Sequence, residues 1–468
     1  MNMKLFYIIL SIVLVLPNST TLLSNMKGGI GMMGSNTAEI IVDGHQDALY
    51  KSIDSETWLP TTDLGKNTDF EVDIPKLQKG GLNVPFLAAY TPGFYGNDAR
   101  SISHTLAQIS SLYWTAENNA EQLQIVSHAP DILATANRGK IAAVPTIEGA
   151  YSLNKENAIE LTRQYQDLGI AVMGFTWNYS NALGEGADQI YDDQAKTASS
   201  GGLTELGAKV VKEMNSLGMA VDVSHMAEST FWDVMETTKA PVIATHSGVK
   251  ALKDHQRNLT DEQLVALKEN GGVIGIVFYP EFLTDSGGAT ISDVVDHIDH
   301  AVKIMGVDHV AIGSDFDGAE LPSDIKDSSE IGKIKEALTE RGYSEEEVSK
   351  IMGLNTLRVL NEIQGAADRV IRAQGLSIIP EVEMGENLNE RTPTLTAELK
   401  VEEGTELDPE SLKVIVDGIS NQATYDKKLA ILSFTPKEPL KEKFHVVTFL
   451  GADKEGNEQR TTRIFRVE

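Results

Sequence analysis

The stretch from Glu39 to Asp47 is an apolar run that ends in two residues able to bind a metal ion, His45 and Asp47. Side chains alternate across a strand, so a histidine and an aspartate two positions apart point to the same side and can close on one cation. Taken alone, the pair is more typical of a solvated strand end. Further donors follow other apolar runs of the chain: Glu148, His225, His246, Asp315 and Asp317. A metal site is predicted if these run ends meet in space.

The composition limits the classes of protein and of metal site. The 468 residues carry a formal charge of −28 and are 41% hydrophobic, which indicates a globular chain with a well-buried core. Nucleic-acid binding is not expected, because phosphate contacts need clustered Lys and Arg. The chain has no cysteine, which excludes disulfides, thiolate ligands and a cysteine nucleophile. Any metal must therefore be bound by imidazoles and carboxylates.

Residues 38–366 alternate apolar runs with amphipathic stretches, the pattern of repeated βα units around a parallel sheet. Eight runs are expected to be strands: Glu39–Gly44, Val84–Tyr90, Ile141–Ile147, Ala171–Thr176, Met219–Val223, Pro241–Thr245, Val273–Phe278 and His309–Gly313. Eight such units predict an α/β fold, the (β/α)8 TIM barrel. That fold gathers the carboxyl ends of its strands at one rim, where the donors named above would meet.

The donors suffice for two divalent ions if one carboxylate bridges them: His45, Asp47, Glu148, His225 and His246. Glu148 is the natural bridge. Imidazole with carboxylate suits Zn²⁺ best, and Mn²⁺ and Co²⁺ are alternatives. Two such ions about 4 Å apart hold a water whose pKa falls from about 16 toward about 7, so a bridging hydroxide is expected at neutral pH. A carboxylate across the barrel mouth can take the proton of this water and pass it to a leaving amine.

Several motifs follow one another along the chain: Val42–Asp47, Thr146–Gly149, Asp222–His225, Thr245–Ser247, Arg257–Asn258 and Gly313–Gly318, together with Gly202–Gly207 and Gly353–Arg358. In this order they resemble the membrane (renal) dipeptidase family of binuclear zinc peptidases. Each motif is modest by itself, but six in order are highly specific, and they cover most of residues 40–362. The resemblance implies a barrel of the metal-dependent hydrolase type that acts on a small-molecule substrate, a dipeptide.

The resemblance also implies a ligand set for two zinc ions. His45 and Asp47 would bind one zinc, and His225 and His246 would bind the other. Glu148 would bind both ions.

The resemblance implies catalytic and substrate-binding roles for two further residues, and the sequence differs from the family in one segment. Asp315 would shuttle the proton, and Arg257 would grip the free carboxylate of the substrate, which selects dipeptides by length. Family members carry a Leu-Thr-His segment after strand four that is thought to touch the reacting carbonyl oxygen. Here Phe175–Asn178 stands instead, and Trp177 has one indole N–H and cannot become a cation. Oxyanion stabilisation is then expected from the zinc ions, from Asn178 or from elsewhere.

The two ends of the chain differ from the barrel. Within residues 1–25, the positively charged Lys4 precedes an apolar stretch that is too short to span a bilayer comfortably. This pattern is typical of a signal peptide or an N-terminal anchor. We therefore expect export, to an extracellular, periplasmic or cell-surface location, and a flexible lead-in at 26–37. Residues 367–388 are expected to be a linker. The short alternating runs of 389–468 predict a small β-sandwich that loosely resembles bacterial immunoglobulin-like modules.

Three functions remain open. The first is an exported zinc dipeptidase, the second a related metal-dependent amidase, deacylase or lactonase, and the third a non-catalytic surface binding protein, favoured by Trp177 alone. Association with the cell surface and a homodimer are left open. Other histidines are expected to have structural places: His104 and His128 at the surface, and His297, His300 and His309 in packing or capping.

Overall fold

The computed structural model describes residues 39–96, 98–187, 201–368, 373 and 375–468. The expected signal segment and lead-in, residues 1–37, lie outside the described residues. Residues 39–468 belong to one compact unit. Among the described helices, none has both the length and the apolar composition needed to cross a membrane.

A parallel barrel of eight strands, in the order β1-β2-β4-β5-β6-β7-β8-β9, confirms the predicted TIM barrel. The barrel nearly closes where Gln46 pairs with Phe316 and the N–H of Asp47 donates to the carbonyl of Phe316 at 2.9 Å. An additional strand, β3 (Leu123–Ile125), pairs with β4 beside the barrel. The barrel strands are β1 Val42–Gln46, β2 Val84–Tyr90, β4 Ile141–Glu148, β5 Val172–Gly174, β6 Ala220–Asp222, β7 Ile243–Ser247, β8 Val273–Ile276 and β9 Val310–Ile312.

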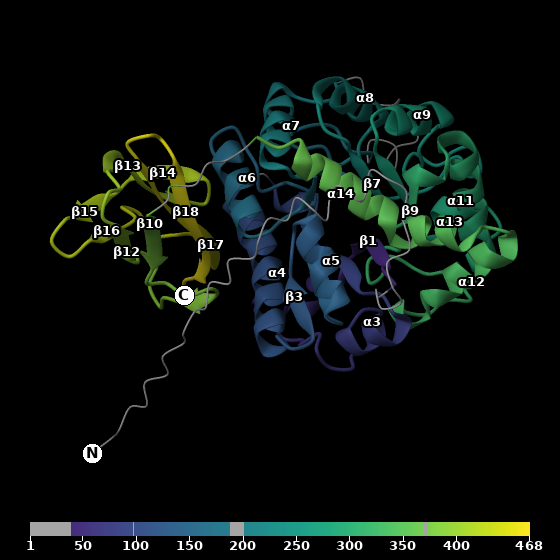
Figure 1. Cartoon of the computed structure of the whole chain (residues 1–468), viewed down its shortest axis with the longest axis horizontal. Coiled ribbons are helices and arrows are strands. Elements are labelled where there is room, and N and C mark those ends of the chain that lie inside the picture. The colour runs from purple at the N-terminus through teal and green to yellow at the C-terminus, as the bar shows by residue number, and fades with distance from the viewer. Residues whose placement is uncertain (1–38, 97, 188–200, 369–372, 374) are drawn as a thin grey trace, which may run out of the picture. The chain divides into compact units, whose positions relative to one another are not determined.

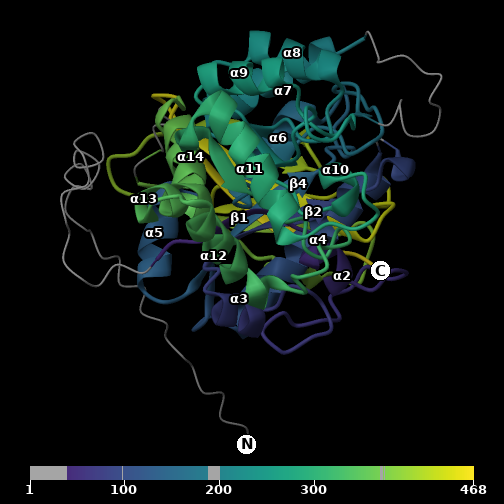
Figure 2. The same ribbon diagram turned by 90° about the vertical axis from the view of Figure 1, so that its right-hand side faces the viewer.

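Helices surround the barrel strands (Figures 1 and 2). Local signals set their ends: α7 begins after Thr204, whose Oγ1 accepts the N–H of Gly207 at 3.0 Å, and it is capped at its C-terminal end by Gly218 with φ of 72°. The helices are α2 Ala48–Ser52, α3 Ile74–Gly80, α4 Ala99–Asn118, α5 Ala129–Asn137, α6 Ala158–Asp167, α7 Glu205–Leu217, α8 Glu228–Thr237, α9 Asp261–Glu269, α10 Pro280–Leu283, α11 Ile291–Met305, α12 Gly332–Arg341, α13 Glu345–Ser349 and α14 Asn355–Gly365, with short turns η2 Gly93–Tyr95, η4 Val307–His309, η5 Ser328–Glu330 and η6 Lys350–Leu354.

The C-terminal part is the predicted β-sandwich, with sheets β10-β12-β16-β15 and β11-β18-β17-β13-β14. In β12, Leu395, Ala397 and Leu399 alternate toward a shared apolar core. The expected linker, 367–388, instead contains β10 and β11, because β10 pairs along its whole length with β12. The strands are β10 Leu376–Pro380, β11 Glu386–Asn387, β12 Leu395–Val401, β13 Leu407–Val416, β14 Ile419–Gln422, β15 Thr424–Asp426, β16 Ile431–Phe434, β17 Phe444–Asp453 and β18 Glu458–Arg466.

The sandwich is bonded to helices α4 and α6 of the barrel. Gln164 on α6 donates its Nε2 to the carbonyl of Ile415 at 3.1 Å, and its Oε1 accepts the N–H of Gly418 at 2.7 Å. On α4, the Oγ of Ser103 accepts the N–H of Phe444 at 2.9 Å. The buried ring of Phe444 belongs to the apolar core of the barrel. The two parts therefore share buried contacts.

Candidate metal centre

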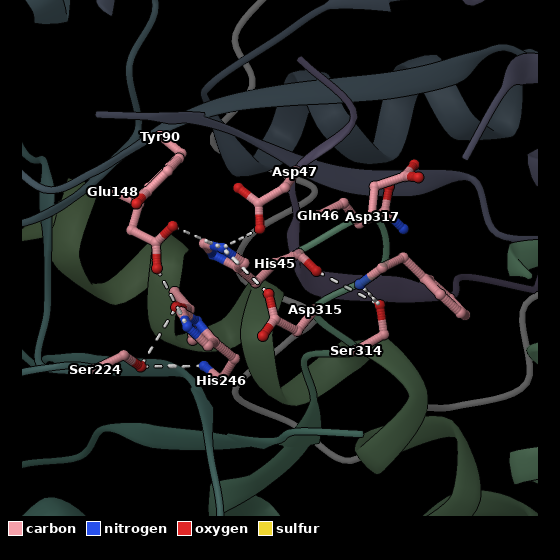
Figure 3. A network of polar contacts seen from close by, with 12 residues as sticks. His45, Gln46, Asp47, Tyr90, Glu148, Ser224, His246, Ser314, Asp315 and Asp317 are labelled. Atoms are coloured by element: carbon pink, nitrogen blue, oxygen red, sulfur yellow. Dashed lines mark hydrogen bonds and ion pairs between the residues drawn. The ribbon is translucent and has the colours of Figure 1, made fainter. Parts of the chain in front are cut away.

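The fold brings the predicted donors together at the carboxyl ends of the barrel strands. His45 lies on β1, Glu148 ends β4, His246 lies on β7, and His225 follows β6. Figure 3 shows the carboxylates of Asp47, Glu148 and Asp315 turned toward the imidazoles of His45 and His246. The side chains of this group are buried or nearly so. Residues far apart in sequence thus form one polar cluster inside an apolar barrel.

Glu148 lies at the centre, and its two oxygens face different partners. Oε1 lies 2.9 Å from the Nε2 of His225 and 3.4 Å from the Nε2 of His246. Oε2 lies 3.5 Å from the Nε2 of His45, which is in turn 3.3 Å from Oδ2 of Asp47. A carboxylate with one oxygen toward each pair has the arrangement of a bridging ligand.

The Nδ1 atoms of His225 and His246 have hydrogen-bond partners that determine which nitrogen of each ring carries the proton. The Nδ1 of His225 donates to Oδ1 of Asn178 at 2.9 Å. The Nδ1 of His246 donates to Oγ1 of Thr245 at 2.9 Å, because that hydroxyl gives its own proton to Oδ2 of Asp222 at 2.6 Å. With the proton on Nδ1, the lone pair of each Nε2 points at Glu148, as a metal ligand requires.

Small residues let the strands that carry these ligands approach closely. A Cβ on Gly44, Gly275 or Gly313 would collide with the carbonyl oxygen of Thr245. These glycines lie on or beside β1, β8 and β9, so their absent side chains let those strands pack against β7. The rings of His45 and His246 consequently lie with centroids 3.8 Å apart.

Two buried aspartates fasten the backbone of the loops beneath the site. Asp43 accepts the N–H and the Oγ–H of Ser314 at 2.7 and 2.5 Å, which ties β1 to the loop after β9. Asp222 accepts the N–H groups of Ser224 and Thr245 at 2.9 and 3.0 Å. These supporting roles were not predicted, although both aspartates lie inside the same short motifs as the ligands.

Two loop residues of the site have left-handed backbone. His225 has φ of 63° and Asp315 has φ of 65°. Such values are uncommon away from glycine, and they cost energy that the surrounding contacts must supply. The loops after β6 and β9 thus hold their side chains at the mouth under constraint.

Burial and mutual charge shift the pKa values of the cluster. Burial alone would lower the pKa of His45, but the carboxylates of Glu148 and Asp47 outweigh it and raise that pKa well above its usual value. Burial, with the charge of Asp47, raises the pKa of Asp315 well above its usual value. Burial lowers the pKa of His225 to about 3. The cluster thus offers protons the same atoms that would bind a cation, so a bound cation would compete with protons.

The donor set fits divalent cations. Three overlapping sets of donor atoms each lie within 4.8 Å of one another: His45, Asp47 and Glu148; Glu148, His225 and His246; and His45, His246 and Asp315. Within the described part of the chain, the buried Nε2 of His45 and Oδ1 of Asp47 make no hydrogen bond. Buried polar atoms without hydrogen bonds are rare and call for an explanation, and a metal ion supplies one.

The predicted substrate residues divide into two groups. Arg257 is buried beside the cluster, where its Nη2 donates to the carbonyl of His246 at 3.0 Å. The ring of Trp177 lies 6.0 Å from that of His225. Asn178, considered as an oxyanion donor, directs its carbonyl oxygen at the Nδ1 of His225 at 2.9 Å, so it also positions this ligand residue.

Two residues outside the cluster, Asp317 and His297, have structural contacts. Asp317 accepts the N–H groups of Glu71 and Val72 at 2.9 and 3.0 Å, and so closes a loop. His297 is buried, with its Nε2 3.0 Å from the carbonyl of Leu283. The surface prediction for His104 is wrong: it is 2% exposed on α4, because aromatic rings from other segments cover it. No local sequence signal reports that cover.

Residues 36–374 match the family described as membrane dipeptidase, peptidase family M19. The chain belongs to this family. An uncharacterized dipeptidase of Schizosaccharomyces pombe is 33% identical over 335 residues, which are 68% of this chain and 79% of that protein. The dipeptidase tcpJ of Claviceps purpurea is 33% identical over 345 residues, 69% of this chain and 77% of that protein.

Solved structures of two metallopeptidases, the first of them assigned to family M19, are similar to this chain. The metallopeptidase "dipeptidase AC" is 27% identical with a TM-score of 0.62, covering 70% of this chain and 99% of its own. A metallopeptidase of Rhodobacter sphaeroides, solved with a phosphinate mimic of the dipeptide L-Ala-D-Ala, is 26% identical with a TM-score of 0.61 and the same coverage. The chain is thus a metal-dependent dipeptidase of the membrane dipeptidase family, which confirms the resemblance to that family. The likeness of the C-terminal part to immunoglobulin-like modules stays a prediction.

Proposed function

We propose that this membrane dipeptidase family member is an exported enzyme that holds two zinc ions and hydrolyses the peptide bond of dipeptides. His45 and Asp47 would hold one ion, His225 and His246 the other, and Glu148 both. The proposal rests on how the two carboxylate oxygens of Glu148 are placed. Oε1 faces His225 and His246, while Oε2 faces His45. Imidazole with carboxylate suits zinc best, and manganese and cobalt are the alternatives that metal analysis would distinguish.

When bound, two zinc ions would lower the pKa of a water from about 16 toward about 7 and polarise the peptide carbonyl. Asp315 would transfer the proton, because its Oδ1 lies 3.9 Å from the Nε2 of His45, at the edge of the metal-ligand cluster. Burial and the charge of Asp47 raise the pKa of this carboxyl, so the proton it accepts can be passed on to a leaving amine. It takes the proton released as water adds to the carbonyl carbon, and gives it to the nitrogen as the C–N bond breaks.

Arg257 would bind the carboxylate of the substrate. Its guanidinium is held beside the cluster by the carbonyl of His246, and a planar fork of N–H donors matches a carboxylate. The dipeptide mimic bound to the Rhodobacter sphaeroides relative supports a substrate of this size. A dipeptide amide lacks that charge, so its kcat/KM should be lower by about 100-fold, as for loss of a charge-assisted hydrogen-bond pair.

Export is proposed from composition. Residues 5–16 are an apolar stretch that follows Lys4, as in secretion signals. The test is fractionation of cells that express the full chain, with and without residues 2–25. Retention of the full chain in the cytoplasm would overturn this part of the proposal and leave the enzymatic part standing.

The central test measures metal content and amine release on the same purified protein. About two zinc ions per chain, with chelator-sensitive cleavage of dipeptides, is the expected result. In Glu148→Gln the zinc content should fall below two, whereas the exposed matched change Glu156→Gln should leave it unchanged. Cleavage of N-acyl amino acids or lactones in place of dipeptides would move the activity to another metal-dependent hydrolase. Absence of bound metal after reconstitution with zinc would overturn the site.

A further inference from the structure

A group of partly exposed aromatic rings stands at the mouth of the barrel, next to the metal-ligand cluster. We call it the aromatic wall and define it by Tyr50, Tyr90 and Trp177. The ring of Tyr90 lies 5.4 Å from that of Tyr50 and 5.4 Å from that of Trp177, both edge to face. The three rings come from α2, the end of β2 and the segment after β5. Three separate segments thus build one continuous apolar surface.

The aromatic wall touches the site. The ring of Trp177 lies 6.0 Å from that of the ligand residue His225, and Figure 3 places Tyr90 beside Glu148. A substrate held over the cluster would therefore meet these rings.

The rings are not closed off inside the core. Tyr50 is 43% exposed, and Tyr90 and Trp177 are partly exposed. Large aromatic side chains that remain partly exposed beside a concave polar site are typical of ligand-binding surfaces. Packing against His104 accounts for one edge of Tyr50, but leaves its exposed part without a structural role.

The order of strands in the barrel indicates which end of the substrate lies near the aromatic wall. In the barrel order, β2 is the second strand and β7 the sixth of eight, so they lie on opposite sides. Tyr90 ends β2, whereas Arg257 is bonded to His246 of β7. A dipeptide whose carboxylate is bound by Arg257 extends across Glu148 toward Tyr90. Its N-terminal residue then reaches the aromatic wall, and its C-terminal residue does not.

We propose that the aromatic wall binds the side chain of the substrate's N-terminal residue, and that the enzyme prefers dipeptides with a large apolar or aromatic residue there. This rests on the proposed function, in which Arg257 holds the carboxylate. Edge-to-face and offset contacts with the rings would favour an aromatic side chain beyond the area it buries. The C-terminal side chain is left with little influence on the rate.

The test compares two series of dipeptides on the zinc-loaded enzyme. In X-Gly, where X is Ala, Leu or Phe, kcat/KM should rise by about 10-fold or more from Ala to Phe, as burial of a large side chain predicts. In Gly-X the change should stay within about 3-fold, because X is held away from the wall.

Two variants locate the effect. In Tyr50→Ala and in Trp177→Ala the ratio of kcat/KM for Phe-Gly over Ala-Gly should fall at least about 3-fold, from loss of ring contact. Leu429→Ala, at a 69% exposed position of the sandwich, should leave the ratio unchanged. Thermal unfolding confirms that each variant is folded.

The outcomes separate the two proposals. Hydrolysis of Ala-Gly with a ratio near one, or with a ratio that neither wall variant alters, overturns the aromatic wall and leaves the dipeptidase intact. A reversed preference, for large residues in Gly-X, overturns the orientation. If no dipeptide of either series is cleaved, the proposed function itself fails.

Discussion

The Nδ1 of His225 lies 2.9 Å from Oδ1 of Asn178. The imidazole therefore donates outward to an amide and presents Nε2 to Glu148. Two loops that follow different barrel strands meet in this contact. Asn178 thus helps to hold a ligand residue, and the two residues should be studied as a pair.

Asn178→Ala should lower the affinity for zinc. Loss of the acceptor frees the imidazole to rotate and to change tautomer, which typically weakens metal binding 10–100-fold. Competition with a chelator of known affinity measures this without reference to activity. Asn178→Asp keeps an acceptor and should retain most of the affinity, and Asn118→Ala, at an exposed position of α4, serves as the control. Equal affinities in all four proteins would show that the contact does not position His225.

Asp315→Asn should separate catalysis from metal binding. The amide cannot accept and return a proton, so kcat should fall by about 10²–10⁴-fold. Zinc content should remain near two per chain, because the other donors are intact. Asp285→Asn, at an 83% exposed side chain, should behave as the parent enzyme. Retention of kcat in Asp315→Asn would assign proton transfer to another group.

Gly313→Ala should destabilise the barrel by more than about 3 kcal/mol, or prevent folding, since overpacking in a core costs this much when backbone must move. Its new methyl group would collide with the carbonyl oxygen of Thr245, which is backbone and cannot turn aside. Gly288→Ala is the matched control, because nothing lies within 4 Å of its added Cβ. Chemical denaturation compares the two. Equal unfolding free energies would mean that β7 and β9 can separate at no cost.

Acid should destabilise the fold through His104. Burial, with the nearby charge of Arg100, lowers the pKa of His104 to about 4. The unfolded chain binds a proton near pH 6.5 and the folded chain near pH 4, so the contribution to stability is complete above pH 6.5. It is lost as the pH falls toward 4, by on the order of 3 kcal/mol from a shift of this size.

His104→Gln removes this titration and should flatten the dependence of unfolding free energy on pH between 7 and 4.5. His128→Gln, at an exposed position, should keep the parent slope. Denaturant melts at several pH values measure both. A His104→Gln slope equal to that of the parent would place the acid sensitivity in other groups.

Much of this architecture could be predicted from the sequence, because hydrophobic periodicity reveals the strands and the barrel fold determines where their ends meet. Apolar runs give the eight strands, and the barrel fixes where strand ends meet, so His45 and His246 are placed together without knowledge of their contacts. Contacts made sideways across the rim are different. The partner of Asn178, the link from Thr245 to Asp222, and the cover over His104 depend on loop paths that no local pattern reports.

The predicted linker shows a second limit. Leu376–Pro380 forms an edge strand that pairs with β12, and its identity as a strand depends on a partner further along the chain. Its proline stands at the end of the strand, where a missing N–H is tolerated. Composition in that region resembled a spacer, whereas pairing decides its structure.

The two hydrogen bonds of Gln164 join the barrel to the C-terminal sandwich, and they limit how these two parts could be exchanged with those of related proteins. The family match ends at residue 374, and dipeptidase AC aligns over 99% of its length with 70% of this chain. A cut at that boundary would leave the buried amide of Gln164 and the apolar contact surface of Phe444 facing solvent. Grafting the sandwich onto another barrel would likewise require a host whose α4 and α6 had been redesigned to receive it. In this chain the barrel and the C-terminal unit would therefore have to be transferred together.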